Sequence, residues 1–365
     1  MEARPPPEAF ILPEGAKARI CSRLGIIRKV LEISMKVFVT GAEGFIGSHV
    51  IEALVRAGHD VTALVQYNSR NFLGWLEDLE PEVISSIRPA MGDIRDSGMM
   101  LEALKGQERV IHLAALVAIP YSYLAPSSYV DTNMLGTLNV LEASKRNGIE
   151  RVIHTSTSEV YGSAQYVPID ERHPLVGQSP YSASKIGADQ LAYSYWASFE
   201  TPVVTVRPFN TYGPRQSQRA FIPSLMVQHL DGRKTLSLGS LSPTRDLTFV
   251  SDSAHGFVSV MESDQGLGET FNMGSGFEIS MADVVSMVSD ISGKPIDITV
   301  DEARVRPKKS EVERLWSDST KISQVFGWQP KHQGLPGLRV GLEKTYEWFS
   351  RNFKNGGYDS SKYVR

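Results

Sequence analysis

Short apolar runs alternate with amphipathic segments from residue 36 onward. Residues 36–40 are mostly apolar and predict a strand, residues 45–57 place apolar side chains on one helix face, and residues 60–65 predict a second strand. The same alternation predicts further strands, with helices between them, at 84–91, 109–113, 151–156 and 202–207. It is typical of parallel strands joined by right-handed helical crossovers. We therefore predict an α/β fold with a Rossmann-type, doubly wound parallel sheet.

The pattern also divides the chain into regions. Residues 1–34 open on a Pro-rich, basic stretch and are expected to form a poorly ordered N-terminal extension. Residues 35–209 are predicted to be the dinucleotide-binding domain. Residues 210–353 are predicted to form a smaller, mainly substrate-binding C-terminal lobe, from which elements could return to the Rossmann sheet. The Gly- and Ser-containing tail at 354–365 is expected to be flexible.

Composition narrows the classes of function. The 365 residues carry a net charge of −3, which provides no basic face for nucleic acid, and apolar runs fall short of the about 20 residues that span a membrane. A single cysteine, Cys21, excludes an intrachain disulfide and favours a cytoplasmic location. The histidines lack metal-ligand spacing, so no metal is predicted. Charges in the extension argue against a secretory signal, while a transit peptide or a natural start at Met35 stays open.

A glycine-rich turn joins the first predicted strand to the first helix. Its G-x-x-G-x-x-G pattern permits a tight turn and offers helix N–H groups to a pyrophosphate, so it predicts a dinucleotide site formed by Gly41, Gly44, Phe45, Ile46 and Gly47. Further cofactor contacts are predicted for Asp93 and Ile94 beside the adenine, and for Leu113, Ala114 and Ala115 on the ribose side.

The choice between NAD and NADP is less directly indicated. Residues 64–68, at the end of the second predicted strand, lack the acidic residue that would bind a ribose 2′-hydroxyl. Arg70 could bind a 2′-phosphate or be solvated. NAD is the predicted cofactor, and NADP stays open.

Two short stretches carry the candidate chemistry. Tyr181 and Lys185 are four apart, so on a helix the ammonium can lie beneath the phenol and favour phenolate, which would supply a base that also contacts the cofactor. Thr157, Ser158 and Glu159 precede them, and alcohol oxidation alone would not require the Glu159 carboxylate. This carboxylate favours a dehydratase over a simple dehydrogenase.

The ordered motifs resemble those of extended short-chain dehydrogenases/reductases of the nucleotide-sugar epimerase/dehydratase family. The resemblance covers residues 36–349 and rests on residues 40–47, Asp93, 131–133, 155–162, 181–185, 207–210, 212–215 and 245–252. The Thr157-Ser158-Glu159 triplet is similar to that of GDP-mannose 4,6-dehydratases and also occurs in UDP-glucuronate decarboxylases. The whole chain looks most like the nucleotide-GlcNAc 4,6-dehydratases of legionaminic-acid-type pathways, including its residues 118–123, 240–246 and 309–316.

The resemblance implies a 4,6-dehydratase that converts GDP- or UDP-GlcNAc to its 4-keto-6-deoxy product by internal hydride transfer through NAD(P). It implies a substrate contact for Asn210 and a homodimer built through a four-helix bundle. Arg215 and Arg245 are candidates for the diphosphate, because guanidinium groups bind phosphate oxygens bidentately; a structural salt bridge is the alternative for each. A 4-epimerase, a UDP-glucuronate decarboxylase and a non-catalytic NAD(P) sensor are the competing hypotheses.

Overall fold

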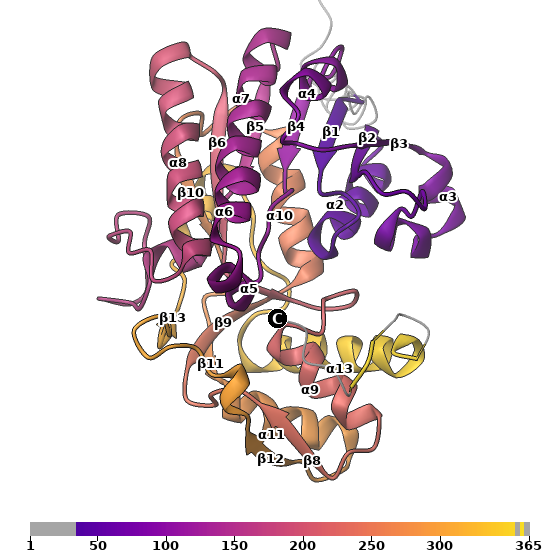
Figure 1. Ribbon diagram of the computed structural model, residues 1–365, viewed down its shortest axis with the longest axis vertical. Coiled ribbons are helices and arrows are strands. Elements are labelled where there is room, and N and C mark those ends of the chain that lie inside the picture. Colours follow the sequence, from indigo (N-terminus) through magenta and orange to yellow (C-terminus); the bar gives the residue numbers. More distant parts are fainter. Residues whose placement is uncertain (1–33, 355–357, 361–365) are drawn as a thin grey trace, which may run out of the picture. The chain divides into compact units, whose positions relative to one another are not determined.

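The structure, a computed structural model, describes residues 34–354 and 358–360. The predicted extension therefore lies outside the described residues apart from its last position, as does most of the predicted tail. From Lys36 onward the chain contains a large parallel sheet with helices on both faces, followed by smaller mixed elements (Figure 1).

Seven strands of the described chain form one sheet in the order β10-β6-β5-β4-β1-β2-β3, and the neighbouring pairs are parallel. These strands are β1 (Lys36–Thr40), β2 (Asp60–Gln66), β3 (Ile87–Gly92), β4 (Arg109–His112), β5 (Arg151–Thr155), β6 (Val203–Pro208) and β10 (Thr270–Met273). The order reverses at β1 and β4, which creates a crevice at their carboxyl ends. The predicted Rossmann-type fold is confirmed.

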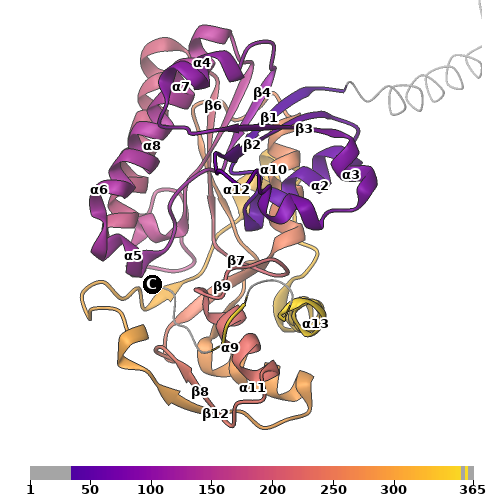
Figure 2. The same cartoon turned by 45° about the vertical axis from the view of Figure 1, so that its right-hand side comes forward.

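Helices cover both faces of the sheet. Figure 2 shows one face covered by α4 (Ser97–Ala103), α7 (Gly136–Asn147) and α8 (Pro180–Phe199), and the other by α2 (Phe45–Arg56) and α10 (Val250–Glu262). The short helix α12 (Thr320–Phe326) contacts β10. The α8 helix starts sharply because Ser179 and Ser182 form a capping box around Pro180. Because β10 pairs with β6 and α10 packs on α2, elements from beyond residue 210 join the Rossmann part. The domain boundaries themselves stay a prediction.

The C-terminal elements form a second core. Its strands are β7 (Asn210–Tyr212), β8 (Thr235–Leu238), β9 (Thr244–Phe249), β11 (Glu278–Ser280), β12 (Asp297–Val300) and β13 (Arg314–Leu315), and its helices are α9 (Phe221–Leu230), α11 (Met281–Ser292) and α13 (Gly334–Asn352). Buried side chains from these helices and strands, among them Leu225, Phe249 and Leu342, pack into one apolar cluster. This core supports the wall that faces the sheet crevice.

Short elements complete the described chain. They are η1 (Gly74–Asp78), α3 (Pro81–Ser85), α5 (Ile119–Leu124), α6 (Pro126–Tyr129), η2 (Val130–Leu135), η3 (Ser158–Tyr161) and η4 (Glu302–Arg304). The strand predicted at 84–91 begins only at Ile87, because Pro81 at the first helical position starts the α3 turn.

The helix that begins near Asp131 opens with a π-helical segment before α7. There the buried Asn133 side chain bonds both backbone groups of Leu116, at 2.9 and 3.0 Å, and the Ser184 hydroxyl at 2.9 Å. These bonds tie the loop after β4 to α8, so the widened turn serves to position one wall of the crevice.

Candidate active site

A cavity of about 920 Å³ runs along the carboxyl ends of the sheet strands. One part of it is lined by the glycine-rich turn, the end of β2 and residues at or after the ends of β3 and β4. Residues of η3 and α8 line a second part, and residues of α9, β8 and β9 line a third. Open α/β sheets bind ligands in this crevice, where the strand order reverses. The cavity is therefore the candidate active site.

The glycine-rich turn is built for close approach of backbones. Gly41 has a φ of +67°, and a Cβ on it would lie 2.8 Å from the backbone nitrogen of Ala114. A Cβ on Gly47 would lie 2.1 Å from the carbonyl oxygen of Gly41. Gly44 is the N-cap of α2 and makes no side-chain cap, so backbone N–H groups at this helix end are open to a ligand. These features fit the pyrophosphate of a dinucleotide.

All residues predicted to bind the cofactor line the cavity: Gly41, Gly44, Phe45, Ile46, Gly47, Asp93, Ile94, Leu113, Ala114, Ala115, Tyr181 and Lys185. The structure thus brings together segments that are far apart in sequence, while their contacts with a cofactor stay a prediction. Arg70 is exposed and is not among the lining residues, and its backbone N–H bonds the Asn68 side chain at 3.2 Å.

The candidate catalytic residues meet where β5 ends. Thr157 is the N-cap of η3, and its hydroxyl accepts the backbone N–H of Glu159 at 3.2 Å. Glu159 and Tyr181 are each 7% exposed and Lys185 is 4% exposed, and all of these residues line the cavity. The Lys185 ammonium donates to the carbonyl of Thr155 at 2.6 Å, which ties α8 to the end of β5.

The surroundings of Tyr181 set the pKa of its phenol. Burial raises the pKa of the Tyr181 phenol well above its ordinary value; the Thr157 hydroxyl lowers it and the Glu159 carboxylate raises it further. Burial of the phenol therefore outweighs the other effects on its pKa, and the Lys185 charge is not among the groups that shift it, so the predicted phenolate at Tyr181 stays a prediction. Burial also lowers the pKa of Lys185 to about 8, opposed by the Asp189 charge.

A chain of charges links Glu159 to β9. The Arg306 guanidinium lies 3.5 Å from the Glu159 carboxylate and 3.8 Å from that of Glu311, which in turn lies 3.3 Å from the guanidinium of Arg245. Burial alone would lower the pKa of Arg306, but Glu159 and Glu311 raise it above its ordinary value. Since all of these residues line the cavity, the pairing holds the Glu159 carboxylate beside a permanent cation.

The predicted substrate residues are placed differently from one another. Asn210 and Arg245 line the cavity, and the Oδ1 atom of Asn210 is buried with no hydrogen-bond partner among the described residues. Arg215 is not a lining residue: its guanidinium donates to Glu52 on α2 at 2.8 Å. The alternative of a structural salt bridge is thus present in this structure, because α2 presents a carboxylate within reach of Arg215, and its contact with a diphosphate stays a prediction.

The model of the GDP-mannose 4,6 dehydratase family matches residues 38–339. The chain belongs to the NAD-dependent nucleotide-sugar epimerase/dehydratase family. Among its relatives, dTDP-glucose 4,6-dehydratase of an Actinoplanes strain is 31% identical over 323 residues, which cover 87% of this chain and 98% of the relative. UDP-glucose 4-epimerase of Mycolicibacterium smegmatis is 32% identical over 323 residues, covering 86% of this chain and 98% of the relative.

Solved structures give the same family. DesIV, a dTDP-glucose 4,6-dehydratase from Streptomyces venezuelae solved as a double mutant with NAD bound, has a TM-score of 0.77 at 29% identity and covers 88% of this chain and 98% of its own. UDP-glucuronic acid 4-epimerase from Bacillus cereus, solved with UDP-glucuronic acid and NAD, has a TM-score of 0.77 at 29% identity, with coverages of 87% and 99%. This member of the family is thus similar to dehydratases and epimerases alike.

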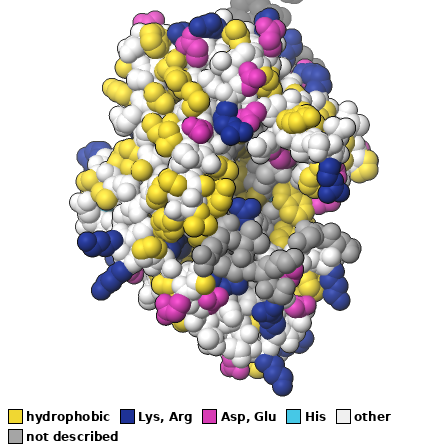
Figure 3. Space-filling view, viewed as in Figure 1, with side chains coloured by type: hydrophobic (Ala, Val, Ile, Leu, Met, Phe, Trp, Pro, Cys, Tyr) yellow, Lys and Arg dark blue, Asp and Glu magenta, His cyan; other side chains and the backbone are white. Residues whose placement is uncertain are grey.

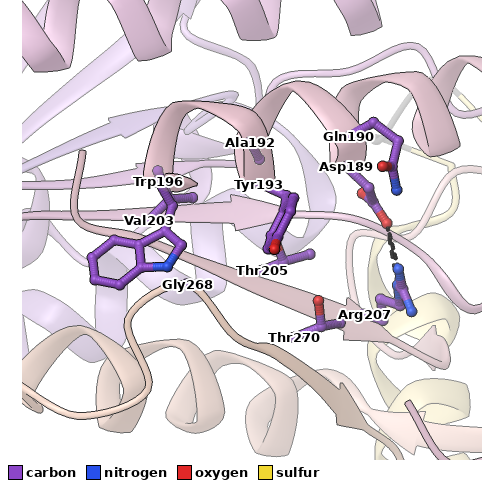
Figure 4. Close-up of a pocket in the computed structure, with 10 residues that line it drawn as sticks. All are labelled: Asp189, Gln190, Ala192, Tyr193, Trp196, Val203, Thr205, Arg207, Gly268 and Thr270. Carbon is purple, nitrogen blue, oxygen red and sulfur yellow. Dashed lines mark hydrogen bonds and ion pairs between the residues drawn. The ribbon is translucent and has the colours of Figure 1, made fainter. Parts of the chain in front are cut away.

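In this member of the epimerase/dehydratase family, a buried polar network supports α8, the helix that carries Tyr181 and Lys185. A small cavity of about 120 Å³ lies beside α8, β6 and β10, and Figure 4 shows the Asp189–Arg207 ion pair at its edge. The Asp189 carboxylate lies 3.0 Å from Nε2 of His154 and accepts from Ser156 at 2.8 Å and from Arg207 at 2.9 Å. Although burial opposes its charge, these partners hold the pKa of Asp189 below its ordinary value. The network joins β5 and β6 to the helix that carries Lys185.

Several cavity residues escaped sequence reasoning. Arg219, Arg304 and Arg306 line the cavity from loops and short elements whose positions no period of the sequence predicts. Glu43, inside the glycine-rich turn, also lines it. In the sequence, Arg304 and Arg306 stand shortly before Pro307, and Glu43 lies between Gly41 and Gly44. Neither pattern indicates which residues these side chains would contact.

Within residues 34–354 and 358–360, no group of three or more His, Cys, Asp or Glu side chains is placed to hold a metal ion. No helix in the same ranges has the length and hydrophobicity needed to cross a bilayer.

Proposed function

We propose that the protein is a nucleotide-sugar 4,6-dehydratase that acts on an NDP-N-acetylhexosamine, GDP- or UDP-GlcNAc, with NAD as its bound cofactor. The observation that carries the proposal is the Glu159 carboxylate. It is nearly buried, lines the same cavity as Thr157 and Tyr181, and lies 3.5 Å from the Arg306 guanidinium. Such a group is positioned to remove a carbon-bound proton, a step that dehydration requires and that alcohol oxidation does not.

The oxidation half of the reaction is assigned to Tyr181, Thr157 and Lys185. When bound, NAD supplies the acceptor and later the donor of the hydride. The Tyr181 phenolate takes the proton of the sugar C4 hydroxyl, and the Thr157 hydroxyl hydrogen-bonds the same oxygen. The Lys185 ammonium, with a pKa of about 8, is charged at neutral pH and favours the phenolate form during the reaction. A 4-keto sugar results.

The elimination half is assigned to Glu159. The C4 ketone acidifies the C5 proton, which the Glu159 carboxylate accepts. Loss of the C6 hydroxyl as water then needs a proton, and Glu159, having just gained one, can return it to that oxygen. The buried Ser158, acting through a water, is the alternative acid. Hydride returned to C6, together with a solvent proton delivered to C5 through Glu159, would complete the 4-keto-6-deoxy product, and the proton that Tyr181 took from the C4 hydroxyl would return to solvent.

The N-acetylhexosamine part of the proposal is supported by where the resemblance lies. The segments most similar to nucleotide-GlcNAc dehydratases contribute lining residues, among them Ala118, Ser240, Pro243 and Glu311. A similarity confined to distant surface loops would carry no information about substrate. The curated relatives that act on dTDP-glucose make that sugar the natural comparison.

A second candidate, UDP-glucuronate decarboxylase or 4-epimerase, is favoured by Arg306. A guanidinium beside Glu159 could equally bind a C6 carboxylate. UDP-glucuronic acid 4-epimerase is among the similar structures. A non-catalytic sensor is the weakest candidate, since Tyr181 and Lys185 are both present in the cavity.

The deciding experiment is NMR of the purified protein with UDP-GlcNAc, GDP-GlcNAc, dTDP-glucose and UDP-glucuronate in deuterated water. A C6 methyl signal with deuterium at C5 from an N-acetylglucosamine donor is the expected result, and it identifies the nucleotide. A C6 methyl product from dTDP-glucose alone would support the dehydratase reaction but contradict the proposal that the substrate is an N-acetylhexosamine. A pentose, or a C4 epimer with C6 intact, would reject the dehydratase.

We also propose a cytoplasmic homodimer formed through α7 and α8. Hydrophobic side chains gather over the region of these helices on the left of Figure 3, and Leu124, Val130 and Leu135 are among the exposed ones nearby. Light scattering after size exclusion is expected to give a dimer, and Leu135→Asp a monomer, because a charge would be buried at the interface. Val300→Asp, on β12, is the matched control. A wild-type monomer contradicts the proposal.

A further inference from the structure

Glu43 has a partly buried carboxylate, and only one of its oxygens has a hydrogen-bond partner among the described residues. One oxygen, Oε1, accepts the backbone N–H of Gln66 at 2.9 Å. The other, Oε2, is buried and has no hydrogen-bond partner among the described residues. Such an atom is costly to bury unless a partner completes it. Because Glu43 and Gln66 both line the cavity and the bond between them is exposed, a bound molecule can approach the carboxylate from the side of Oε1.

The position of this carboxylate within the cavity is specific. Gln66 is the last residue of β2 and pairs with Gly92 at the end of β3. The end of the second strand is where dinucleotide-binding folds place an acidic residue against the ribose of the adenosine half. This chain has Gln66, Tyr67 and Asn68 there instead. The bond to Gln66 brings the carboxylate of Glu43 to the same place from the glycine-rich turn.

We infer that Glu43 binds the adenosine ribose diol of NAD and excludes the 2′-phosphate of NADP. An ionised carboxylate accepts hydrogen bonds from hydroxyl groups and repels a phosphate dianion, and both effects are strengthened by partial burial. The residue thereby supplies, from another element, the acidic group that the end of β2 lacks.

The surroundings confine the side chain to this role. The backbone N–H of Trp75 bonds the carbonyl of Glu43 at 3.0 Å, and a Cβ on Gly74 would lie 2.8 Å from the Cβ of Glu43. The segment that begins η1 therefore packs directly over the residue. Burial raises the pKa of Glu43 and the Gln66 N–H opposes this, as expected for a carboxylate that lacks one partner.

The cations at this end of the cavity are already engaged or lie outside it. Asp93 binds Arg95 through both oxygens, with its Oδ2 2.6 Å from Nη2 of Arg95 and its Oδ1 3.0 Å from Nε. Arg70 is exposed and does not line the cavity. A 2′-phosphate placed here would therefore meet Glu43, with Arg95 already bound to Asp93 and Arg70 outside the cavity lining.

The test is the dissociation constant of the full-length protein for NAD and for NADP, measured by calorimetry after removal of co-purified dinucleotide. Wild type is expected to prefer NAD by on the order of 100-fold, and Glu43→Gln to lose roughly 10-fold or more of that preference, as removal of one charge-assisted bond and one repulsion predicts. NADP should bind the variant more tightly than it binds wild type. The readout is binding, so it does not depend on the sugar that the enzyme uses.

Glu77→Gln is the matched control. Its carboxylate also accepts a backbone N–H at 2.9 Å, from Leu73, but it is exposed and does not line the cavity, so both constants should stay unchanged. Equal wild-type affinity for NAD and NADP overturns the inference. An equal loss of affinity for NAD and for NADP in Glu43→Gln also overturns the inference, because it would indicate a purely structural role for Glu43. If Glu43→Gln does not fold, Glu43→Asp retains the charge and should still reject NADP while binding NAD more weakly.

Discussion

Replacing Tyr181 by Phe is expected to lower kcat by at least ~10³-fold, because the phenol oxygen is the group assigned to remove the C4 hydroxyl proton. The fold should persist. The Tyr181 ring packs edge-to-face against Tyr129 with centroids 6.2 Å apart, and a Phe ring fills the same space. Binding of NAD, measured by calorimetry, should change little, since the glycine-rich turn is untouched. The steady-state rate with the substrate identified by NMR is the measurement.

Tyr129→Phe is the control for this change. Tyr129 lies beside Tyr181, but its hydroxyl donates to the carbonyl of Ala118 and it does not line the cavity. Its removal should cost stability of about 1 kcal/mol, as for one hydrogen bond, with little effect on kcat. Wild-type turnover in Tyr181→Phe would remove Tyr181 from the mechanism. Equal losses in both variants would point to packing of the two rings instead of proton transfer.

Glu159→Gln is expected to separate the two halves of the reaction. Oxidation at C4 should still occur, because Tyr181, Thr157 and Lys185 are retained. Deuterium uptake at C5 and release of water should fall by at least ~10²-fold, since an amide cannot accept the C5 proton. A single-turnover experiment should therefore show reduced nicotinamide accumulating while the C6 methyl signal is absent.

The structure explains why this variant should still fold. The amide of Gln has nearly the shape of the carboxylate, and the bond from Thr157 is made to the backbone N–H of residue 159, which the change leaves in place. Arg306 loses one anionic partner but keeps Glu311 at 3.8 Å. The charge-matched control is Glu313→Gln, because Glu313 is an exposed carboxylate two residues after Glu311. Normal C5 exchange in Glu159→Gln would end the assignment of Glu159 as the base.

The family and its core chemistry were accessible to sequence reasoning because they depend on local spacing. The glycine-rich turn, the strand and helix periods and the four-residue interval of Tyr181 and Lys185 are properties of neighbouring residues. The structure confirms the fold that they predict, and it places the predicted cofactor and catalytic residues around one cavity. The departures were local as well: Pro81 started a helical turn where a strand was expected to begin.

Contacts between residues far apart in sequence were decided by the tertiary structure alone. Arg215 pairs with Glu52 and not with the cavity, whereas Arg306 reaches Glu159 from a loop that no sequence period places there. The pKa of Tyr181 is raised because the folded chain removes water from the phenol, an effect that the Tyr-Lys spacing cannot report.

For Glu43, the sequence and the tertiary structure each supply part of the information. Its place in the glycine-rich turn is read from sequence, but the bond to Gln66 and the unpaired Oε2 exist only after β1 and β2 align. The sequence by itself determined the fold class, the glycine-rich turn and the spacing of Tyr181 and Lys185. The tertiary structure decided which charges face the cavity and which are neutralised elsewhere, because burial and long-range pairing set the energy of a charge.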